Sequence, residues 1–71
     1  MNKEMRARSY AVFASLAQER GIKPARVASD LGLFASTLSD WKRCKSAPNA
    51  ESLYKISKYF GVDISVFLED E

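Results

Sequence analysis

The sequence has no histidine and only one cysteine, Cys44, among its 71 residues. A single thiol cannot form a disulfide within the chain, and a structural zinc site needs four cysteine or histidine ligands, so both are excluded for one chain. The sequence also lacks a carboxylate pair at catalytic spacing and a glycine-rich phosphate loop. We therefore expect a protein that is not an enzyme and that binds no cofactor, no metal ion and no small-molecule ligand.

Long apolar stretches are missing as well. The longest uninterrupted apolar run, residues 10–14, is far too short to span a membrane. The first four residues do not lead into the basic segment, apolar core and cleavage site of a signal peptide. We expect a cytoplasmic protein that has no membrane partner.

The length of the chain leaves room for one hydrophobic core. A chain of this size buries only about 60% of its unfolded surface, so its stability depends on good helix packing. No strand pattern and no internal repeat is present. We expect an all-α domain over residues 1–71, with a core at about residues 10–68 and an acidic end at residues 69–71.

The net charge of +2 hides an uneven distribution. Residues 1–62 contain all 11 lysines and arginines and five acidic residues, a balance of +6, whereas residues 63–71 contribute −4. A basic body with an acidic end favours nucleic-acid binding more than the total suggests. Charge alone leaves a merely solvated basic surface as an equal alternative.

Residues 24–41 contain two short helical patterns that meet at Gly32 with almost no linker. Val27 and Leu31 share one face of the first pattern, and Leu38 and Trp41 share one face of the second. Glycine passes such a tight corner without a Cβ penalty. This is the helix-turn-helix layout, in which the second helix enters the DNA major groove.

The remaining elements are marked by apolar spacing, caps and glycines. Asn49 and Asp63 are good helix N-caps, whereas Lys23 is a poor one in front of Pro24. Gly21 and Gly61 mark helix ends. We expect five helices, at residues 4–20, 24–31, 35–43, 50–60 and 64–68. Arg6 and Arg8 on the first helix have two readings, phosphate contact or a solvated face, and the solvated face is favoured.

The third helix has an unusual outer face. Leu38 and Trp41 point toward the core and Lys45 lies marginally on that side, whereas Ser36 and Ser39 lie on the opposite face. An ordinary solvated helix carries longer glutamate and lysine side chains there. Short side chains let a helix backbone approach base edges closely.

In this order the motifs resemble the lambda-repressor-like, or Cro/C1-type (XRE), helix-turn-helix family. The matching motifs are L-A-Q-E-R-G-I (16–22), V-A-S-D-L-G-L (27–33), S-T-L-S-D-W-K-R (36–43), K-S-A-P (45–48) and L-Y-K-I-S-K-Y-F-G-V (53–62). The resemblance covers about residues 10–68. It implies a compact five-helix, phage-type repressor domain of the bacterial cytoplasm and nucleoid, which binds double-stranded operator DNA, usually as a homodimer.

Three positions depart from the family pattern. Cys44 stands where the family usually has glycine, and a left-handed backbone there strains the chain by roughly 1–2 kcal/mol. A tolerated substitution is favoured over a redox switch. Phe34 stands where serine or threonine usually caps the third helix. It either covers a thymine methyl group or packs over the turn, and packing is favoured. Ala35 replaces a long polar reader, which predicts modest discrimination at each base pair.

The resemblance divides DNA binding between two sets of residues. The expected base-reading residues are Ala35, Ser36, Thr37, Asp40 and Arg43. Asp40 either accepts a hydrogen bond from cytosine or pairs with Arg43, and pairing is slightly favoured. The expected phosphate contacts are Lys42, Arg43, Lys45, Ser46 and Asn49, with backbone amides at the starts of the second and fourth helices.

The expected function is that of a sequence-specific transcriptional regulator, a repressor that inserts its third helix into the operator major groove. Two-fold pairing would use Ile64, Val66 and Phe67. The expected apolar face of the last helix consists of Ile64, Phe67 and Leu68, so Ile64 and Phe67 are expected rather to close the core, and Val66 to be exposed. The alternative is a protein-interaction module, either antitoxin-like or a regulator-docking domain, whose basic face is incidental.

Overall fold

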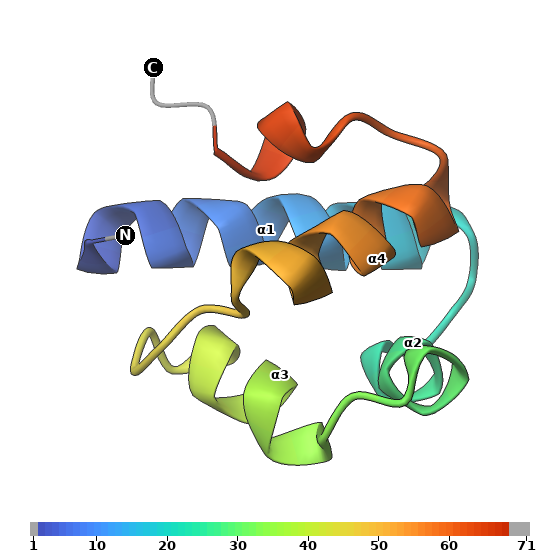
Figure 1. The fold of residues 1–71 in the computed structure, drawn as a ribbon, viewed down its shortest axis with the longest axis horizontal. Helices are drawn as coiled ribbons and strands as arrows, with labels where there is room; N and C mark the ends of the chain where they lie inside the picture. Colours follow the sequence, from blue (N-terminus) through green and yellow to red (C-terminus); the bar gives the residue numbers. More distant parts are fainter. Residues whose placement is uncertain (1, 69–71) are drawn as a thin grey trace.

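The computed structural model describes residues 2–68 and contains helices but no strand in that range (Figure 1). Its elements are α1 (Lys3–Glu19), α2 (Pro24–Leu31), α3 (Ala35–Lys42), α4 (Ala50–Phe60) and the 3₁₀ helix η1 (Ile64–Phe67). The predicted all-α fold is confirmed, and α2 and α4 have the predicted bounds. The predicted acidic end, residues 69–71, lies outside the described residues.

The fifth element differs from the expected α-helix. The N–H groups of Val66 and Leu68 donate to the carbonyls of Asp63 and Ser65, three residues earlier, at 3.1 and 2.9 Å. This is the bonding pattern of a 3₁₀ helix, which is stable only over short stretches. The described chain therefore has four α-helices followed by one 3₁₀ helix of four residues.

Asparagine side chains begin two of the α-helices. Asn2 accepts a hydrogen bond from the Met5 N–H and Asn49 accepts one from the Ser52 N–H, each at 2.8 Å. Both bonds satisfy an amide that the first helical turn leaves without a backbone partner. The cap at Asn49 was predicted, whereas the cap at Asn2 extends α1 one residue beyond the predicted start. Lys23 provides no side-chain cap for α2, as expected.

The arrangement of the helices leaves α2 and α3 together on one side of the molecule. Helix α1 contacts α3 on one side and η1 on the other, and α4 contacts η1 and α2 (Figure 1). α2 and α3 also contact each other. η1 and α3 thus lie on opposite sides of α1 (Figure 1), and the rings of Phe67 and Trp41 approach each other in the core between them, with 6.2 Å between their centroids.

Trp41 of α3 is fully buried at the centre of an aromatic cluster. Its ring centroid lies 5.1 Å from that of Phe13, 5.4 Å from that of Tyr10 and 6.2 Å from that of Phe67. The indole Nε1–H donates to the Ser9 hydroxyl at 2.9 Å. A buried indole N–H without a hydrogen-bond partner would destabilise the fold. The hydrogen bond to the Ser9 hydroxyl removes this cost of burying Trp41.

Three predicted positions at the ends of helices are wrong. Val66 is half-buried and packs against the core rather than being exposed. Leu68, which was assigned to the apolar face of the last helix, is 45% exposed. Lys45 is exposed because the chain leaves α3 before it reaches that residue.

Within residues 2–68, no helix combines the length and the apolar character that a membrane crossing requires.

Candidate nucleic-acid interface

The turn between α2 and α3 depends on Gly32. Its backbone is left-handed (φ 70°, ψ 28°), and the next N–H, that of Leu33, donates to the Ala28 carbonyl at 2.8 Å. No atom lies within 4 Å of the place that a Cβ on Gly32 would occupy. Glycine is therefore required by the backbone conformation and not by lack of space. The chain then passes through Leu33 and Phe34 into α3.

The inner face of α3 packs into the core. Leu38 and Trp41 are its two buried residues, and α2 contributes Val27 and Ala28 to the same core. Ala28 is almost fully buried, and α2 and α3 contact each other. The predicted helix-turn-helix geometry is present.

The residues proposed to read bases all reach the molecular surface. Ala35, Ser36 and Arg43 are exposed, and Thr37 and Asp40 are half-buried. Apart from Arg43 these side chains are short, so the outer face of α3 is formed mainly by short polar and methyl groups. A surface of this kind brings the helix backbone close to whatever binds there.

The favoured pairing of Asp40 with Arg43 is not formed: in the described part of the chain, no ion pair joins them. The main chain of Asp40 is used instead. Its carbonyl accepts hydrogen bonds from the N–H groups of Lys45 at 2.9 Å and Ser46 at 3.4 Å. Within residues 2–68, the carboxylate of Asp40 makes no ion pair or hydrogen bond.

The end of α3 is shaped by Cys44, which has a left-handed backbone (φ 61°). Its N–H donates to the Trp41 carbonyl at 3.0 Å. Cys44 thus has the left-handed backbone for which the strain was expected, and it carries a side chain at a position whose conformation favours glycine.

Arg6, which lies in α1, and Arg20, which is the C-cap residue of α1, donate hydrogen bonds to carbonyls at the C-terminal ends of other helices. Arg6 donates to the Cys44 carbonyl at 2.8 Å, and Arg20 donates to the Phe60 carbonyl at 2.7 Å. A cation at a helix C-terminus also interacts favourably with the helix dipole. The favoured prediction of a solvated face for Arg6 is wrong, since its guanidinium fixes the end of α3.

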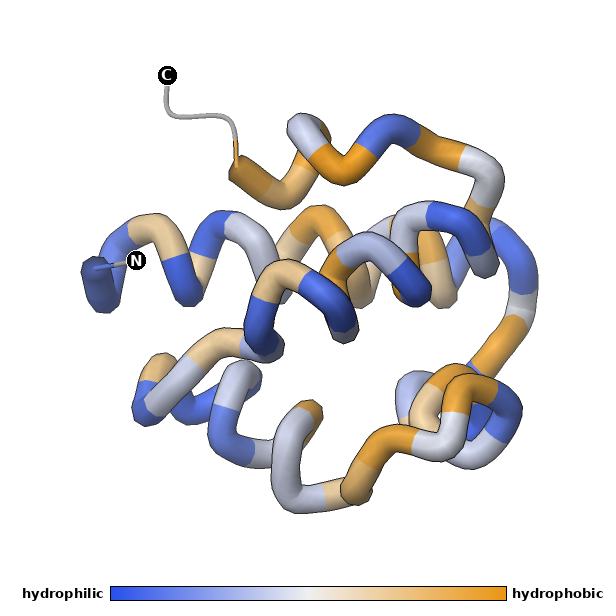
Figure 2. The backbone as a smooth tube through the Cα atoms, in the orientation of Figure 1, coloured by the Kyte–Doolittle hydropathy of each residue, from blue (hydrophilic) through white to orange (hydrophobic). Residues whose placement is uncertain are grey.

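Phe34 does not pack over the turn. Its side chain is 81% exposed, whereas its neighbour Leu33 is half-buried and packs against the core. The turn between α2 and α3 is consequently a strongly apolar part of the surface (Figure 2). The favoured prediction of packing for Phe34 is wrong.

The residues proposed to bind phosphate gather at the C-terminal end of α3 and in the connection to α4. Lys42, Arg43, Lys45, Ser46 and Asn49 are all exposed. Asn49 uses its side-chain oxygen as the cap of α4, so its exposed amide NH₂ group is not used by the cap. Three cations and two neutral donors thus lie beside the outer face of α3.

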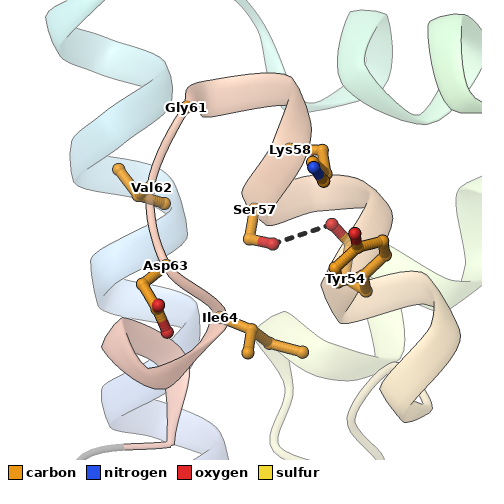
Figure 3. A pocket seen from close by; sticks show the side chains of 7 residues that line it. All are labelled: Tyr54, Ser57, Lys58, Gly61, Val62, Asp63 and Ile64. Atoms are coloured by element: carbon orange, nitrogen blue, oxygen red, sulfur yellow. Dashed lines mark hydrogen bonds between the residues drawn. The ribbon is translucent and has the colours of Figure 1, made fainter.

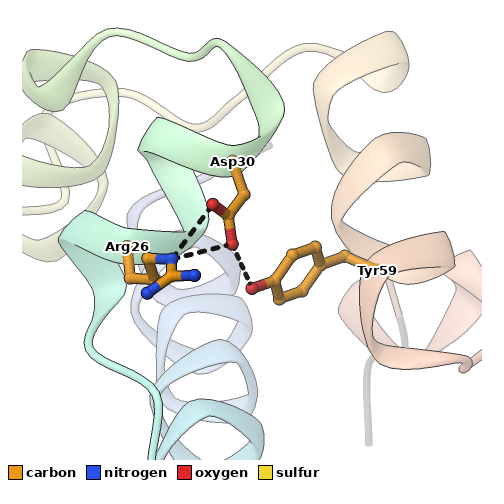
Figure 4. A network of polar contacts seen from close by, with 3 residues as sticks. All are labelled: Arg26, Asp30 and Tyr59. Carbon is orange, nitrogen blue, oxygen red and sulfur yellow. Dashed lines mark hydrogen bonds and ion pairs between the residues drawn. The ribbon is translucent and has the colours of Figure 1, made fainter.

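A polar network ties α2 to α4 (Figure 4). Asp30 accepts a hydrogen bond of 2.7 Å from the Tyr59 hydroxyl and contacts Arg26 Nε through both carboxylate oxygens, at 3.0 and 3.2 Å. The Tyr59 hydrogen bond, followed by that of Arg26, lowers the pKa of Asp30 below its ordinary value. The same hydrogen bond raises the pKa of Tyr59.

A shallow hollow of about 390 Å³ lies between α4 and η1 (Figure 3). Its lining includes Tyr54, Lys58 and Ile64, and the Ser57 hydroxyl inside it already donates to the Tyr54 carbonyl at 2.7 Å. The hollow is on the η1 side of the molecule and is separate from the outer face of α3.

The contributions of Ser9, Arg6 and Arg20 were not predicted. Each acts on a group more than 30 residues away in the chain. No local spacing marks such a pair, because the partner is a backbone carbonyl or a buried indole. A basic residue near the start of a helix carries no sign of which helix end it will cap.

Comparison with known proteins adds one result. Residues 13–71 match the family model described as the Cro/C1-type helix-turn-helix DNA-binding domain. Searches of curated proteins and of solved structures returned no significant match.

Replacing Cys44 by glycine is expected to raise the free energy of unfolding by about 1 kcal/mol, because glycine adopts the left-handed conformation without a Cβ penalty. Urea and thermal unfolding measure this change. Cys44→Ser is the matched control, since it removes the thiol but keeps the Cβ. A gain of equal size in both variants would place the cost in the thiol and contradict the backbone argument.

Tyr59→Phe is expected to raise the pKa of Asp30 toward its ordinary value, because the largest cause of the lowering is removed. A lowered carboxyl pKa stabilises the fold above the unfolded value of about 3.9 and loses this contribution as the pH falls through the folded value. The loss in free energy of unfolding that Asp30 causes at low pH should therefore be smaller in the variant.

NMR titration of the carboxyl groups measures this shift. Asp63 is the internal control, because its pKa is lowered by hydrogen bonds from Ser65 and not by Tyr59. An Asp30 titration that is the same in the variant and the natural protein would remove Tyr59 as the cause.

Proposed function

The chain belongs to the Cro/C1-type helix-turn-helix DNA-binding family, whose members regulate transcription, and we propose that it is a sequence-specific repressor that inserts α3 into the major groove of operator DNA. The observation that supports this most directly is the outer face of α3. Two buried residues, Leu38 and Trp41, hold the helix, and its other face carries only short or flexible side chains at the surface.

The dimensions of the helix fit this role. An α-helix with its side chains is about 10–12 Å across, and the major groove of B-form DNA is about 12 Å wide. Short residues such as Ala35 and Ser36 reduce the width of the helix on the side that would face the base pairs. Longer side chains there would keep the helix axis away from the base pairs.

Base reading is assigned to five residues of α3 and its cap. The methyl groups of Ala35 and Thr37 contact thymine methyl groups, and the Ser36 hydroxyl donates or accepts at a base edge. Asp40 accepts a hydrogen bond from the amino group of cytosine, since no ion pair with Arg43 occupies it. Arg43 reaches a guanine or the adjacent phosphate.

Affinity comes mainly from phosphate contacts. Lys42, Arg43 and Lys45 supply positive charge, and Ser46 and Asn49 supply neutral donors next to it. Neutralisation of phosphates releases counterions, so the affinity falls as salt rises. The backbone amides at the starts of α2 and α4 add anion-binding dipoles.

Two copies of the chain are proposed to bind two half-sites about one DNA turn, or roughly 34 Å, apart. η1 supplies the contact through Ile64 and Val66, which are half-buried. Phe67 is left out of this contact because it is 2% exposed and belongs to the core.

Fluorescence titration of labelled bacterial promoter fragments at two salt concentrations tests the proposed function. Tight binding that weakens with salt and that is retained against random-sequence competitor supports a sequence-specific regulator. Failure to bind any duplex at low salt would favour the protein-interaction module instead.

Arg43→Ala is expected to weaken binding and to reduce the slope of log affinity against log salt by about one, because one phosphate contact is lost. Lys58→Ala is the matched control, since it removes the same charge on the α4–η1 side (Figure 3). An unchanged slope in the Arg43 variant would remove this residue from the phosphate contacts.

Sedimentation of the chain at micromolar concentration, with and without operator DNA, tests the two-fold contact. A dimer on DNA that is weakened by Ile64→Ala supports the contact through η1. A complex that contains one chain per half-site and does not respond to this substitution would contradict it.

A further inference from the structure

Phe34 is the most exposed of the large apolar side chains in the described part of the chain. It is 81% exposed, compared with 52% for Tyr54 and 45% for Leu68. The half-buried Leu33 beside it already provides the apolar contact that the turn makes with the core. The Phe34 side chain therefore contributes little to the packing of the turn.

The position of Phe34 also costs helix stability. It is the N-cap of α3 (φ −71°, ψ 139°) and makes no side-chain cap hydrogen bond. A polar residue such as the Asn49 that caps α4 would satisfy an amide of the first turn. Residues that break a local rule without compensation inside the fold are often found where the protein binds something.

Phe34 lies at the end of α3 that approaches the bases. The N-terminal residues of a recognition helix contact base edges in the major groove. Next to Phe34 the surface continues with the exposed methyl group of Ala35. The leading end of α3 is thus apolar, whereas hydrophilic side chains such as Ser36, Asp40 and Arg43 follow along the helix.

The major groove offers one apolar group to such a surface, the C5-methyl group of thymine. Minor-groove binders also use phenylalanine, but as a wedge between base steps. A residue at the start of a helix lying in the major groove does not reach that position. The chemistry therefore favours a pyrimidine methyl group as the contact of Phe34.

On the premise of the proposed function, we propose that Phe34 is a specificity-determining residue that covers the C5-methyl group of a thymine in each half-site. Cytosine lacks this methyl group and is discriminated against at that position. 5-Methylcytosine carries the same methyl group, so it recovers part of the lost affinity there. Phe34 thereby supplies discrimination that the short Ala35 side chain cannot.

The test begins with selection of bound fragments from random duplex DNA, using the full chain. Each thymine of the selected site is then replaced in turn by uracil, which lacks the C5-methyl group but pairs in the same way. For the natural protein, one such replacement is expected to weaken binding about four-fold, the factor for one buried methyl group. Phe34→Ala is expected to bind the unmodified site about ten-fold more weakly and to lose its sensitivity to that replacement.

Tyr54→Ala is the matched control, because it removes an exposed aromatic side chain on the α4–η1 side of the molecule. It should keep the uracil sensitivity of the natural protein. Phe34→Leu retains an apolar side chain and should keep part of that sensitivity. Circular dichroism and thermal unfolding confirm that the Phe34 variants fold, as expected for so exposed a side chain.

The outcomes separate the two proposals. If no sequence is enriched, the proposed function fails. If a sequence is enriched but Phe34→Ala binds it with unchanged affinity, or keeps the same uracil sensitivity as the natural protein, the role of Phe34 is overturned while the proposed function stands. A selected site that contains no thymine would likewise overturn the role of Phe34 while the proposed function stands. In each of these cases the exposed ring would be open to a protein partner instead.

Discussion

Burial of the Trp41 side chain is the constraint on which the rest of the structure depends. α3 has only two inward-facing large residues, so the indole must supply most of its attachment. It does so by contacting aromatic rings from α1 and η1 and by donating to the hydroxyl of Ser9. Because Trp41 and Leu38 hold the inner face of the helix, the outer positions of α3 are not needed for packing and can be small or polar.

α1 acts as a frame whose charged residues serve the fold. The guanidinium groups of Arg6 and Arg20 are directed to carbonyls at the ends of α3 and α4, and Arg26 on α2 is held by Asp30. These cations are committed within the molecule, although they add to the basic balance seen in the sequence. Among the exposed cations of residues 2–68 without a carboxylate or carbonyl partner, Lys42, Arg43 and Lys45 are close together in sequence at the end of α3, whereas Lys3, Lys23 and Lys58 are spread over other elements.

Local signals predicted most of the fold, because helix caps, glycines and apolar spacing act over a few residues. Gly32, Asn49 and the inward pair Leu38 and Trp41 all have the expected roles. The errors arise where a choice depends on distant parts of the chain. Leu33 and Phe34 are adjacent and both apolar, and only the path of the turn decides that Leu33 packs and Phe34 is exposed. The site residues were predicted to be at the surface and are there, but their contacts with DNA remain predictions.

At position 44, the main chain and the side chain have opposite effects on the stability of the fold. The carbonyl of Cys44 accepts the Arg6 hydrogen bond that joins α1 to α3, whereas its Cβ makes the left-handed corner costly. Glycine, asparagine or aspartate would preserve the same carbonyl at a lower conformational cost. Because the hydrogen bond from Arg6 uses the main chain alone, a change of residue at this corner alters the conformational cost of the turn and leaves the link between α1 and the end of α3 in place.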